Sequence, residues 1–154
     1  MTQLKIGDAV PKFALSDQHG NIVKSTQFKG RFLVIYFYPR ADTPGCTTQS
    51  CAVRDAFPDL KALNAAVLGV SPDTPAKQLK FDEKYSLGFP LLADVDHEMA
   101  DSFGVWAEKM NYGKKYMGIV RSAFVVDPKG KLVGVMYKVS PKDTVPKATS
   151  AISG

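Results

Sequence analysis

The sequence predicts a mixed α/β fold in one domain, with a central mixed sheet flanked by helices. Short apolar runs rich in β-branched and aromatic residues recur along the 154 residues, which is typical of buried strands. Segments with helical character separate several of these runs, as in folds whose helices cover the faces of a sheet. No internal repeat, low-complexity tract or linker interrupts the chain. We therefore expect a single domain over residues 1–154.

The first element expected is an N-terminal β-hairpin. In KFALSDQHGNIVKS, two weakly extended segments flank the residues Gln18 to Asn21, and Gly and Asn favour such turns. Four apolar runs then predict the strands of the sheet core. A second hairpin turn, DPKG, joins the last two of these strands. The core strands are expected at 32–38, 66–70, 123–127 and 132–137.

Helices are expected between the core strands. About twenty residues follow the first strand, which is enough for a helical crossover to a parallel strand. A second helix is predicted at 75–85, with Thr74 as its N-cap and Pro75 at its first position. FPLLAD then predicts a short strand, and DHEMADSFGV predicts a helix with acidic residues in its first turn.

Two segments that contain proline are expected to limit helix formation. Pro58 lies inside the crossover segment, where a proline removes a backbone donor and clashes with the preceding turn, so we expect two helical pieces or a kink. The C-terminal SPKDTVPKATSAISG has weak periodicity and contains Pro146. At most one short helix is expected there.

Charge and hydropathy exclude several classes of function. The net charge is +5, but Lys and Arg are scattered, and no zinc-finger spacing or RNA-binding aromatic motif accompanies them, so nucleic acid is not an expected partner. The longest apolar run has seven residues, against the roughly 20 that a membrane-spanning helix needs. The N-terminal MTQLKIGDAVPKFAL lacks the pattern of a signal peptide. A cytoplasmic protein without a membrane span is expected.

The two cysteines, Cys46 and Cys51, allow three interpretations. A structural zinc site needs four ligands, and the only histidines, His19 and His97, are not near the pair in sequence, so no metal and no cofactor are expected. A structural disulfide would close a very short loop and stabilise the fold little. On one helix the two Cα atoms would lie roughly 8–9 Å apart, beyond the ~7 Å that disulfides tolerate. A working dithiol, whose second thiol meets the first after local unwinding, is favoured.

The order of reaction follows from position. Cys46 comes directly after Thr43-Pro44-Gly45, which is how a chain turns from the end of a strand into a helix. Unpaired N–H groups and the helix dipole stabilise an anion there, so Cys46 is the expected nucleophile. Cys51 lies more than one turn further on and fits a resolving thiol. For each cysteine, packing as a small apolar side chain remains the alternative.

The segment FYPRADTPGCTTQSC resembles the active-site segment of the peroxiredoxins, in particular the peroxiredoxin Q branch, also called bacterioferritin comigratory proteins. Pro39, Thr43 and Cys46 meet the Pro-x-x-x-Thr-x-x-Cys signature, and flanking matches extend over nearly the whole chain. The resemblance implies a thioredoxin-like fold with an added N-terminal hairpin. It also implies reduction of hydrogen peroxide and organic hydroperoxides, an intramolecular disulfide, thioredoxin as the dithiol reductant, and a monomer.

The resemblance also assigns roles to individual residues. It makes Cys46 the peroxidatic and Cys51 the resolving cysteine, and it makes Arg121 of IVRSAF the active-site arginine. It also gives Thr43 a catalytic role beside the thiol, and the remaining residues that it assigns line the substrate pocket: Pro39, Pro44 and Gly45.

The chain departs from the family pattern at Gln49, where many members carry glutamate. Pro58 and the C-terminal tail also differ from the usual pattern. A network built on the missing carboxylate would be altered in this chain.

Two rival functions use the same residues. A thioredoxin-like disulfide exchanger would carry Cys-x-x-Cys, so the longer spacing of Cys46 and Cys51 argues against it. A noncatalytic thioredoxin-like redox sensor or binding module could share the fold and both cysteines.

Overall fold

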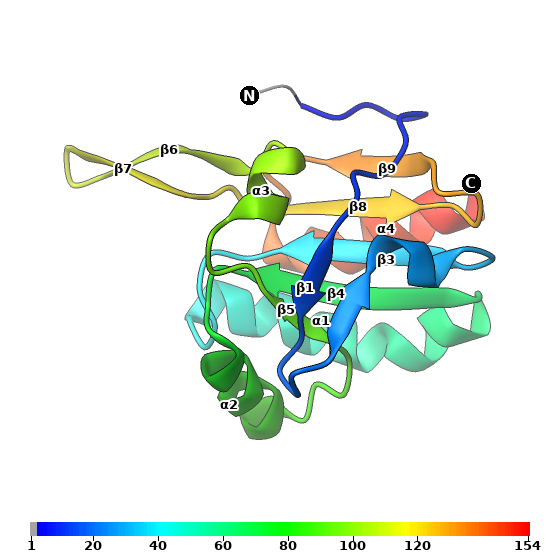
Figure 1. Cartoon of the computed structure of the whole chain (residues 1–154), viewed down its shortest axis with the longest axis horizontal. Coiled ribbons are helices and arrows are strands. Elements are labelled where there is room, and N and C mark those ends of the chain that lie inside the picture. The colour runs from blue at the N-terminus through cyan, green and yellow to red at the C-terminus, as the bar shows by residue number, and fades with distance from the viewer. Residues whose placement is uncertain (1–2) are drawn as a thin grey trace.

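A five-stranded mixed sheet is the centre of the computed structural model, which describes residues 3–154 (Figure 1). The strand order is β5-β4-β3-β8-β9. Strand β4 runs parallel to β3 and β5, whereas β8 is antiparallel to both β3 and β9. Residues 1–2 of the expected domain lie outside the described residues. The bounds are β3 (Phe32–Phe37), β4 (Ala65–Ser71), β5 (Leu91–Ala93), β8 (Ser122–Val126) and β9 (Leu132–Met136).

The sheet is apolar on both faces because successive apolar side chains of its central strands point to opposite faces. In β3, Ile35 and Phe37 belong to one buried cluster, and Val34 and Tyr36 belong to another on the opposite face. Alternation follows from the two-residue repeat of a strand. A sheet buried on both faces requires cover on both sides, which explains the nearly continuous apolar sequence of its strands.

Helices cover one face of the sheet, and the N-terminal hairpin with α3 (Glu98–Ser102) lies over the other (Figure 1). The long helix α1 (Pro44–Ala62) connects β3 to β4, and α4 (Thr144–Ser153) packs beside it against β8 and β9. Helix α2 (Pro75–Tyr85) begins as expected at Thr74, whose hydroxyl accepts a hydrogen bond from the amide of Lys77. Two 3-10 turns complete the helical elements, η1 (Ser25–Phe28) and η2 (Pro141–Asp143).

Of the two outcomes expected at Pro58, two helical pieces or a kink, the first is wrong. Helix α1 continues through Pro58 to Ala62. Pro58 is exposed and lies in the last turns, so water can satisfy the carbonyl of Arg54 that loses its helical donor. The backbone of Leu63 closes the helix by donating to the carbonyls of Asp59 and Leu60. The tail forms the single short helix expected of it.

Two antiparallel hairpins flank the sheet. The predicted one consists of β1 (Ala14–Ser16) and β2 (Ile22–Lys24), and the carboxylate of Asp17 accepts the amides of two residues in its turn. The second consists of β6 (Trp106–Asn111) and β7 (Lys114–Ile119) and projects away from the sheet (Figure 1). Sequence patterns did not predict this second hairpin. No helix within residues 3–154 is long and apolar enough to span a membrane.

Candidate active site

The thiol of Cys46 lies buried in the first turn of α1. Strand β3 ends at Phe37, and the chain turns through Thr43, which has extended backbone angles, into the helix that Pro44 opens. Cys46 has no exposed surface and packs in the same apolar cluster as Tyr36. The thiol therefore lies at the positive end of the helix dipole and is shielded from bulk water.

The loop that leads into α1 is held by neighbouring elements. The amide of Ala41 donates to a carboxylate oxygen of Asp73 at 2.7 Å, and Asp42 accepts from the hydroxyl of Tyr85 at 2.6 Å and from Lys84 at 2.8 Å. Hydrogen bonding to Lys84, then to Tyr85, lowers the pKa of Asp42. These bonds fix the start of α1 to α2 and to the end of β4, although Asp42 itself has a left-handed backbone with φ of 61°.

Arg121, which directly precedes β8, contacts the thiol of Cys46. Its Nη2 donates to Sγ of Cys46 at 3.5 Å. The two residues are 75 apart in sequence, and the sheet brings them together because β8 pairs with β3 in a register that sets Ser122 opposite Phe37. A guanidinium at this position stabilises negative charge on the sulfur or on an oxygen bound beside it.

Gly45 leaves the space that the guanidinium occupies. A Cβ atom at this position would lie 2.9 Å from Nη2 of Arg121 and 3.7 Å from the ring of Pro141. The glycine is helical and does not have a positive φ. Its side-chain hydrogen is therefore required for the close approach of Arg121 to the helix, a role that the sequence pattern alone did not reveal.

The predicted pocket residues Thr43 and Pro39 lie in the loop between β3 and α1, which leads to Cys46. The hydroxyl of Thr43 donates to the carbonyl of Arg40 at 2.9 Å, so its oxygen lone pairs remain to accept a proton donor. Pro39 lines a groove of about 480 Å³ between this loop and the hairpin β6–β7, beside Trp106 and Lys109. The roles of Thr43 and Pro39 toward a peroxide remain predictions.

Lys109 is a residue near the site that the sequence did not single out. Its Nζ donates to the carbonyl of Ile119 at 2.8 Å. Burial, followed by the charge of Arg121, lowers the pKa of Lys109, while the charge of Cys46 acts in the opposite direction. No local pattern in residues 106–110 marked Lys109, because its place near the site depends on how the hairpin folds.

Both cysteines are free and belong to the same uninterrupted helix. Cys51 is half-buried, whereas Cys46 is buried. Helix geometry sets their Cα atoms roughly 8–9 Å apart, beyond the ~7 Å limit of a disulfide. A bond between the two sulfurs therefore requires the turn between them to unwind.

Gln49 links this helix to two distant segments. Its Oε1 accepts from Nη1 of Arg121 at 2.8 Å, and its Nε2 donates to the hydroxyl of Thr144 at 3.0 Å. Gln49 and Thr144 have no exposed surface. The sequence identified Gln49 only as a departure from a pattern and did not identify Thr144.

Within residues 3–154, no group of three or more His, Cys, Asp or Glu side chains is arranged to hold a metal ion. His19 faces Asp82, and His97 pairs with Asp101 and stacks on Trp106. Each histidine thus lies beside one carboxylate.

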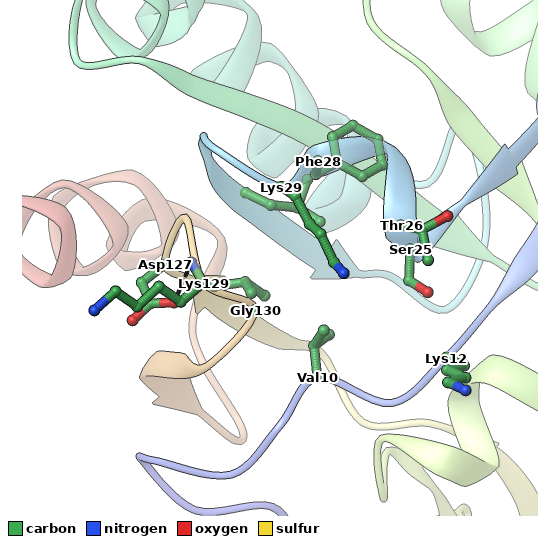
Figure 2. Close-up of a pocket in the computed structure, with 11 residues that line it drawn as sticks. Val10, Lys12, Ser25, Thr26, Phe28, Lys29, Asp127, Lys129 and Gly130 are labelled. Carbon is green, nitrogen blue, oxygen red and sulfur yellow. Dashed lines mark hydrogen bonds between the residues drawn. The ribbon is translucent and has the colours of Figure 1, made fainter.

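A separate hollow of about 190 Å³ lies at the other end of the sheet (Figure 2). Leu33 at the start of β3 and Val126 at the end of β8 line it, whereas Arg121 precedes β8. Figure 2 shows Lys29 reaching over it between Val10 and the segment of Phe28. The hollow is not part of the thiol site.

A thiol at a helix N-terminus, an arginine that donates to it and a second thiol on the same helix define a thiol-dependent redox protein on a thioredoxin-like fold. Residues 6–135 match the sequence model of the AhpC/TSA family. The chain belongs to this family.

Relatives support the same assignment over nearly the full length. The chain is 44% identical over 149 residues to Peroxiredoxin Bcp of Bacillus subtilis, covering 97% of this chain and 95% of the relative. It is 49% identical over 132 residues to Peroxiredoxin Bcp of Escherichia coli K12, covering 86% and 85%. The predicted resemblance to the peroxiredoxin Q and bacterioferritin comigratory branch is confirmed.

Solved structures confirm the fold. Peroxiredoxin Q of Xanthomonas campestris superposes with a TM-score of 0.86 at 35% identity, covering 92% of this chain and 89% of that one. Peroxidoxin BcpB of Mycobacterium tuberculosis superposes with a TM-score of 0.87 at 33% identity, covering 98% and 97%. The predicted thioredoxin-like fold is thus correct.

Proposed function

We propose that the chain is a thiol-dependent peroxidase that reduces hydrogen peroxide and organic hydroperoxides, with Cys46 as its nucleophile. The observation that carries the proposal is the 3.5 Å contact between Arg121 and the buried sulfur of Cys46 at the start of α1. A structure of the Xanthomonas campestris bacterioferritin comigratory protein, 33% identical with a TM-score of 0.87, is described in terms of alkyl peroxide reduction. Membership of the AhpC/TSA family supports the same chemistry.

The first step is attack of the Cys46 thiolate on one peroxide oxygen. A sulfur–oxygen bond forms as the oxygen–oxygen bond breaks, and the electron pair of that bond leaves with the second oxygen. This oxygen takes a proton and departs as water or an alcohol, while Cys46 becomes a sulfenic acid. Arg121 and amides of the first helical turn would stabilise the charge that develops on the two oxygens, while the Thr43 hydroxyl oxygen would accept a hydrogen bond from the peroxide O–H.

The second step joins the two cysteines. The thiol of Cys51 attacks the sulfenic sulfur of Cys46, a disulfide forms, and the hydroxyl leaves with a proton as water. The segment between them must unwind first, because the helix holds them too far apart. An external dithiol, which we propose to be thioredoxin, then reduces the disulfide through a mixed disulfide.

Domain organisation, oligomeric state and cellular compartment are also part of the proposal. We propose a single domain over residues 1–154 that acts as a monomer in the cytoplasm. Two apolar clusters built on the same five strands support one domain, and two free cysteines suit a reducing compartment. Light scattering on the reduced protein tests the monomer directly.

A coupled assay with thioredoxin, its reductase and NADPH tests the function. The wild type should consume NADPH for many turnovers when peroxide is supplied. Cys46→Ser should abolish consumption, because a serine hydroxyl is a far weaker nucleophile and Cys51 lies more than one turn away from the helix N-terminus. Cys51→Ser should consume about one equivalent of peroxide per chain and then stop with thioredoxin.

Two outcomes would contradict the proposal. Turnover by Cys46→Ser near the wild-type rate would exclude Cys46 as the nucleophile. A single stoichiometric oxidation of the wild type, with no further NADPH use, would favour the redox-sensor alternative over the enzyme.

A further inference from the structure

We propose that Gln49 is a positioning residue that aims Arg121 at Cys46 by tying it to the C-terminal helix, and that its neutral amide leaves the positive charge of Arg121 free for the sulfur. The inference rests on the proposed function, because it assigns a role in the same site. No residue of the C-terminal tail had been assigned one.

The hydrogen bonds fix the direction of the link. The hydroxyl of Thr144 donates its only proton to the carbonyl of Ser140 at 3.1 Å, so it offers a lone pair to Gln49. The Nε2 of Gln49 donates to that lone pair at 3.0 Å, which turns Oε1 toward Nη1 of Arg121 at 2.8 Å. Arg121 then directs Nη2 toward Cys46 at 3.5 Å. An amide is the side chain that can donate at one end and accept at the other.

The link is rigid because its members are buried. Gln49 and Thr144 have no exposed surface, and a buried polar group is costly to leave without a partner. Thr144 is the first residue of α4, a helix that packs against α1, β8 and β9. The position of Arg121 therefore depends on where the C-terminal helix docks.

Arg121 forms no ion pair with an acidic side chain within residues 3–154. A glutamate at position 49 would place a buried carboxylate on the same guanidinium, and opposite charges at such a distance attract strongly. The amide holds the guanidinium by the same geometry without competing with a thiolate for its charge.

Other titratable groups near Cys46 do not replace this effect. The charge of Cys46 influences Tyr36 from β3 and Lys109 from β6, and Cys51 on the helix itself also influences Tyr36. Tyr36 is buried and donates its hydroxyl proton to Ser50 at 2.9 Å, so it stays neutral. Lys109 donates to a backbone carbonyl. Arg121 is the cation for which a hydrogen bond to the sulfur is observed.

Position 49 also lies inside the segment that must unwind. It is between Cys46 and Cys51, so both hydrogen bonds of its side chain must break before the two sulfurs meet. The same amide that positions Arg121 for the attack on peroxide therefore also stabilises the helix against this unwinding.

The experiment measures Cys46 directly, with a readout that does not require peroxidase activity. In a Cys51→Ser background, the rate of alkylation of Cys46 by iodoacetamide is followed against pH. Gln49→Glu should shift the profile to higher pH and make alkylation about tenfold slower at neutral pH, because the added carboxylate competes for Arg121. Thr48→Glu adds the same charge at an exposed neighbouring position and should leave the profile close to that of the background.

A second pair of variants separates the hydrogen bond from packing. With both cysteines present, Thr144→Val keeps the shape of the side chain but removes the acceptor, and it should lower kcat/KM for peroxide about tenfold. Thr144→Ser keeps the hydroxyl and should retain most of the activity. A purely structural role would give the reverse order, because serine lacks the packed methyl group that valine keeps.

The outcomes divide cleanly. An alkylation profile in Gln49→Glu that matches Thr48→Glu, or a Thr144→Val variant more active than Thr144→Ser, would overturn the role of Gln49. A wild type that does not turn over peroxide would instead overturn the proposed function. The alkylation profiles would still decide whether Gln49 controls the charge at Cys46.

Discussion

At the scale of single residues, the site depends on how closely a cation approaches a buried sulfur. Cys46 and Arg121 were predicted from the sequence and meet in the structure at 3.5 Å. The bonds of Gln49 to Arg121 and Thr144 were not predicted, because residues 95 positions apart meet only when the C-terminal helix docks. No local sequence pattern encodes such a contact.

Gly45→Ala tests the approach of Arg121 to the helix. The new methyl group would lie 2.9 Å from Nη2 of Arg121, so the guanidinium must move away from the sulfur. We expect kcat/KM for peroxide to fall about tenfold or more, since removing one stabilising donor from a reacting centre costs at least that much. Peroxide kinetics measure the effect.

Stability distinguishes this effect from misfolding. Alanine favours a helix over glycine by up to about 1 kcal/mol. This gain offsets part of the cost of the clash, so Gly45→Ala should lower the free energy of unfolding in urea only slightly. Thr48→Ala, at an exposed position of the same helix, should change neither activity nor stability appreciably. Full activity of Gly45→Ala would show that Arg121 need not lie where it does.

At the scale of elements, strands and helices with a buried face were predictable, and those without one were not. Strands β3, β4, β8 and β9 carry continuous apolar runs because both faces of the sheet are covered. In hairpin β6–β7 Ile119 is the one buried residue, so no apolar alternation marks it. Its one local signal was Tyr112-Gly113, a two-residue turn with positive φ at both positions.

Helix α1 shows how a local rule can be outweighed. The proline rule predicted two helical pieces or a kink at Pro58, yet α1 is one helix because Pro58 is exposed and close to its C-terminal end. Val53 and Leu60, on either side of Pro58, pack in the same apolar cluster. Tertiary burial thus determined the length of the helix.

The anchor between the α1 loop and α2 predicts a small dependence of stability on pH. Hydrogen bonding to Lys84 lowers the pKa of Asp42 in the folded protein. A carboxyl group with a lowered pKa stabilises the fold above its unfolded pKa of about 3.9, and this contribution disappears as the pH falls through the folded pKa. The effect should be small and sensitive to salt, because the pair is exposed.

Asp42→Asn isolates this contribution. The amide keeps an acceptor for Tyr85 and tolerates the left-handed backbone. The variant should unfold at lower urea concentration than the wild type at neutral pH, and the difference should shrink to nothing in strong acid or in concentrated salt. A difference that persists in acid would show that Asp42 acts through its backbone conformation and not through its charge.

At the scale of the whole molecule, the reduced protein should be more stable than the disulfide form. The disulfide removes conformational freedom from the unfolded chain, but a loop this short gives at most about 2 kcal/mol. Forming it unwinds the start of α1, which breaks the backbone hydrogen bonds of that turn and the side-chain bonds of Gln49 and Ser50. Each such bond contributes about 0.5–1.5 kcal/mol, and Cys46 also leaves its apolar cluster.

These losses exceed the gain, so oxidation should lower the free energy of unfolding by about 1–3 kcal/mol. Because folding then opposes the disulfide, the bond should also be easier to reduce in the folded protein than in an unfolded chain, which suits a bond that a dithiol must open at every turnover. Guanidinium unfolding of the reduced protein and of protein oxidised with one equivalent of peroxide measures the difference.

Cys51→Ser that has not been exposed to peroxide is the control for an effect of the reductant itself. Its unfolding midpoint should be the same with and without reductant. An oxidised wild type that unfolds at the same or a higher guanidinium concentration than the reduced form would mean that the two sulfurs bond without disturbing α1. Because helix geometry holds their Cα atoms roughly 8–9 Å apart, that outcome would require the two cysteines to lie elsewhere than on one continuous helix.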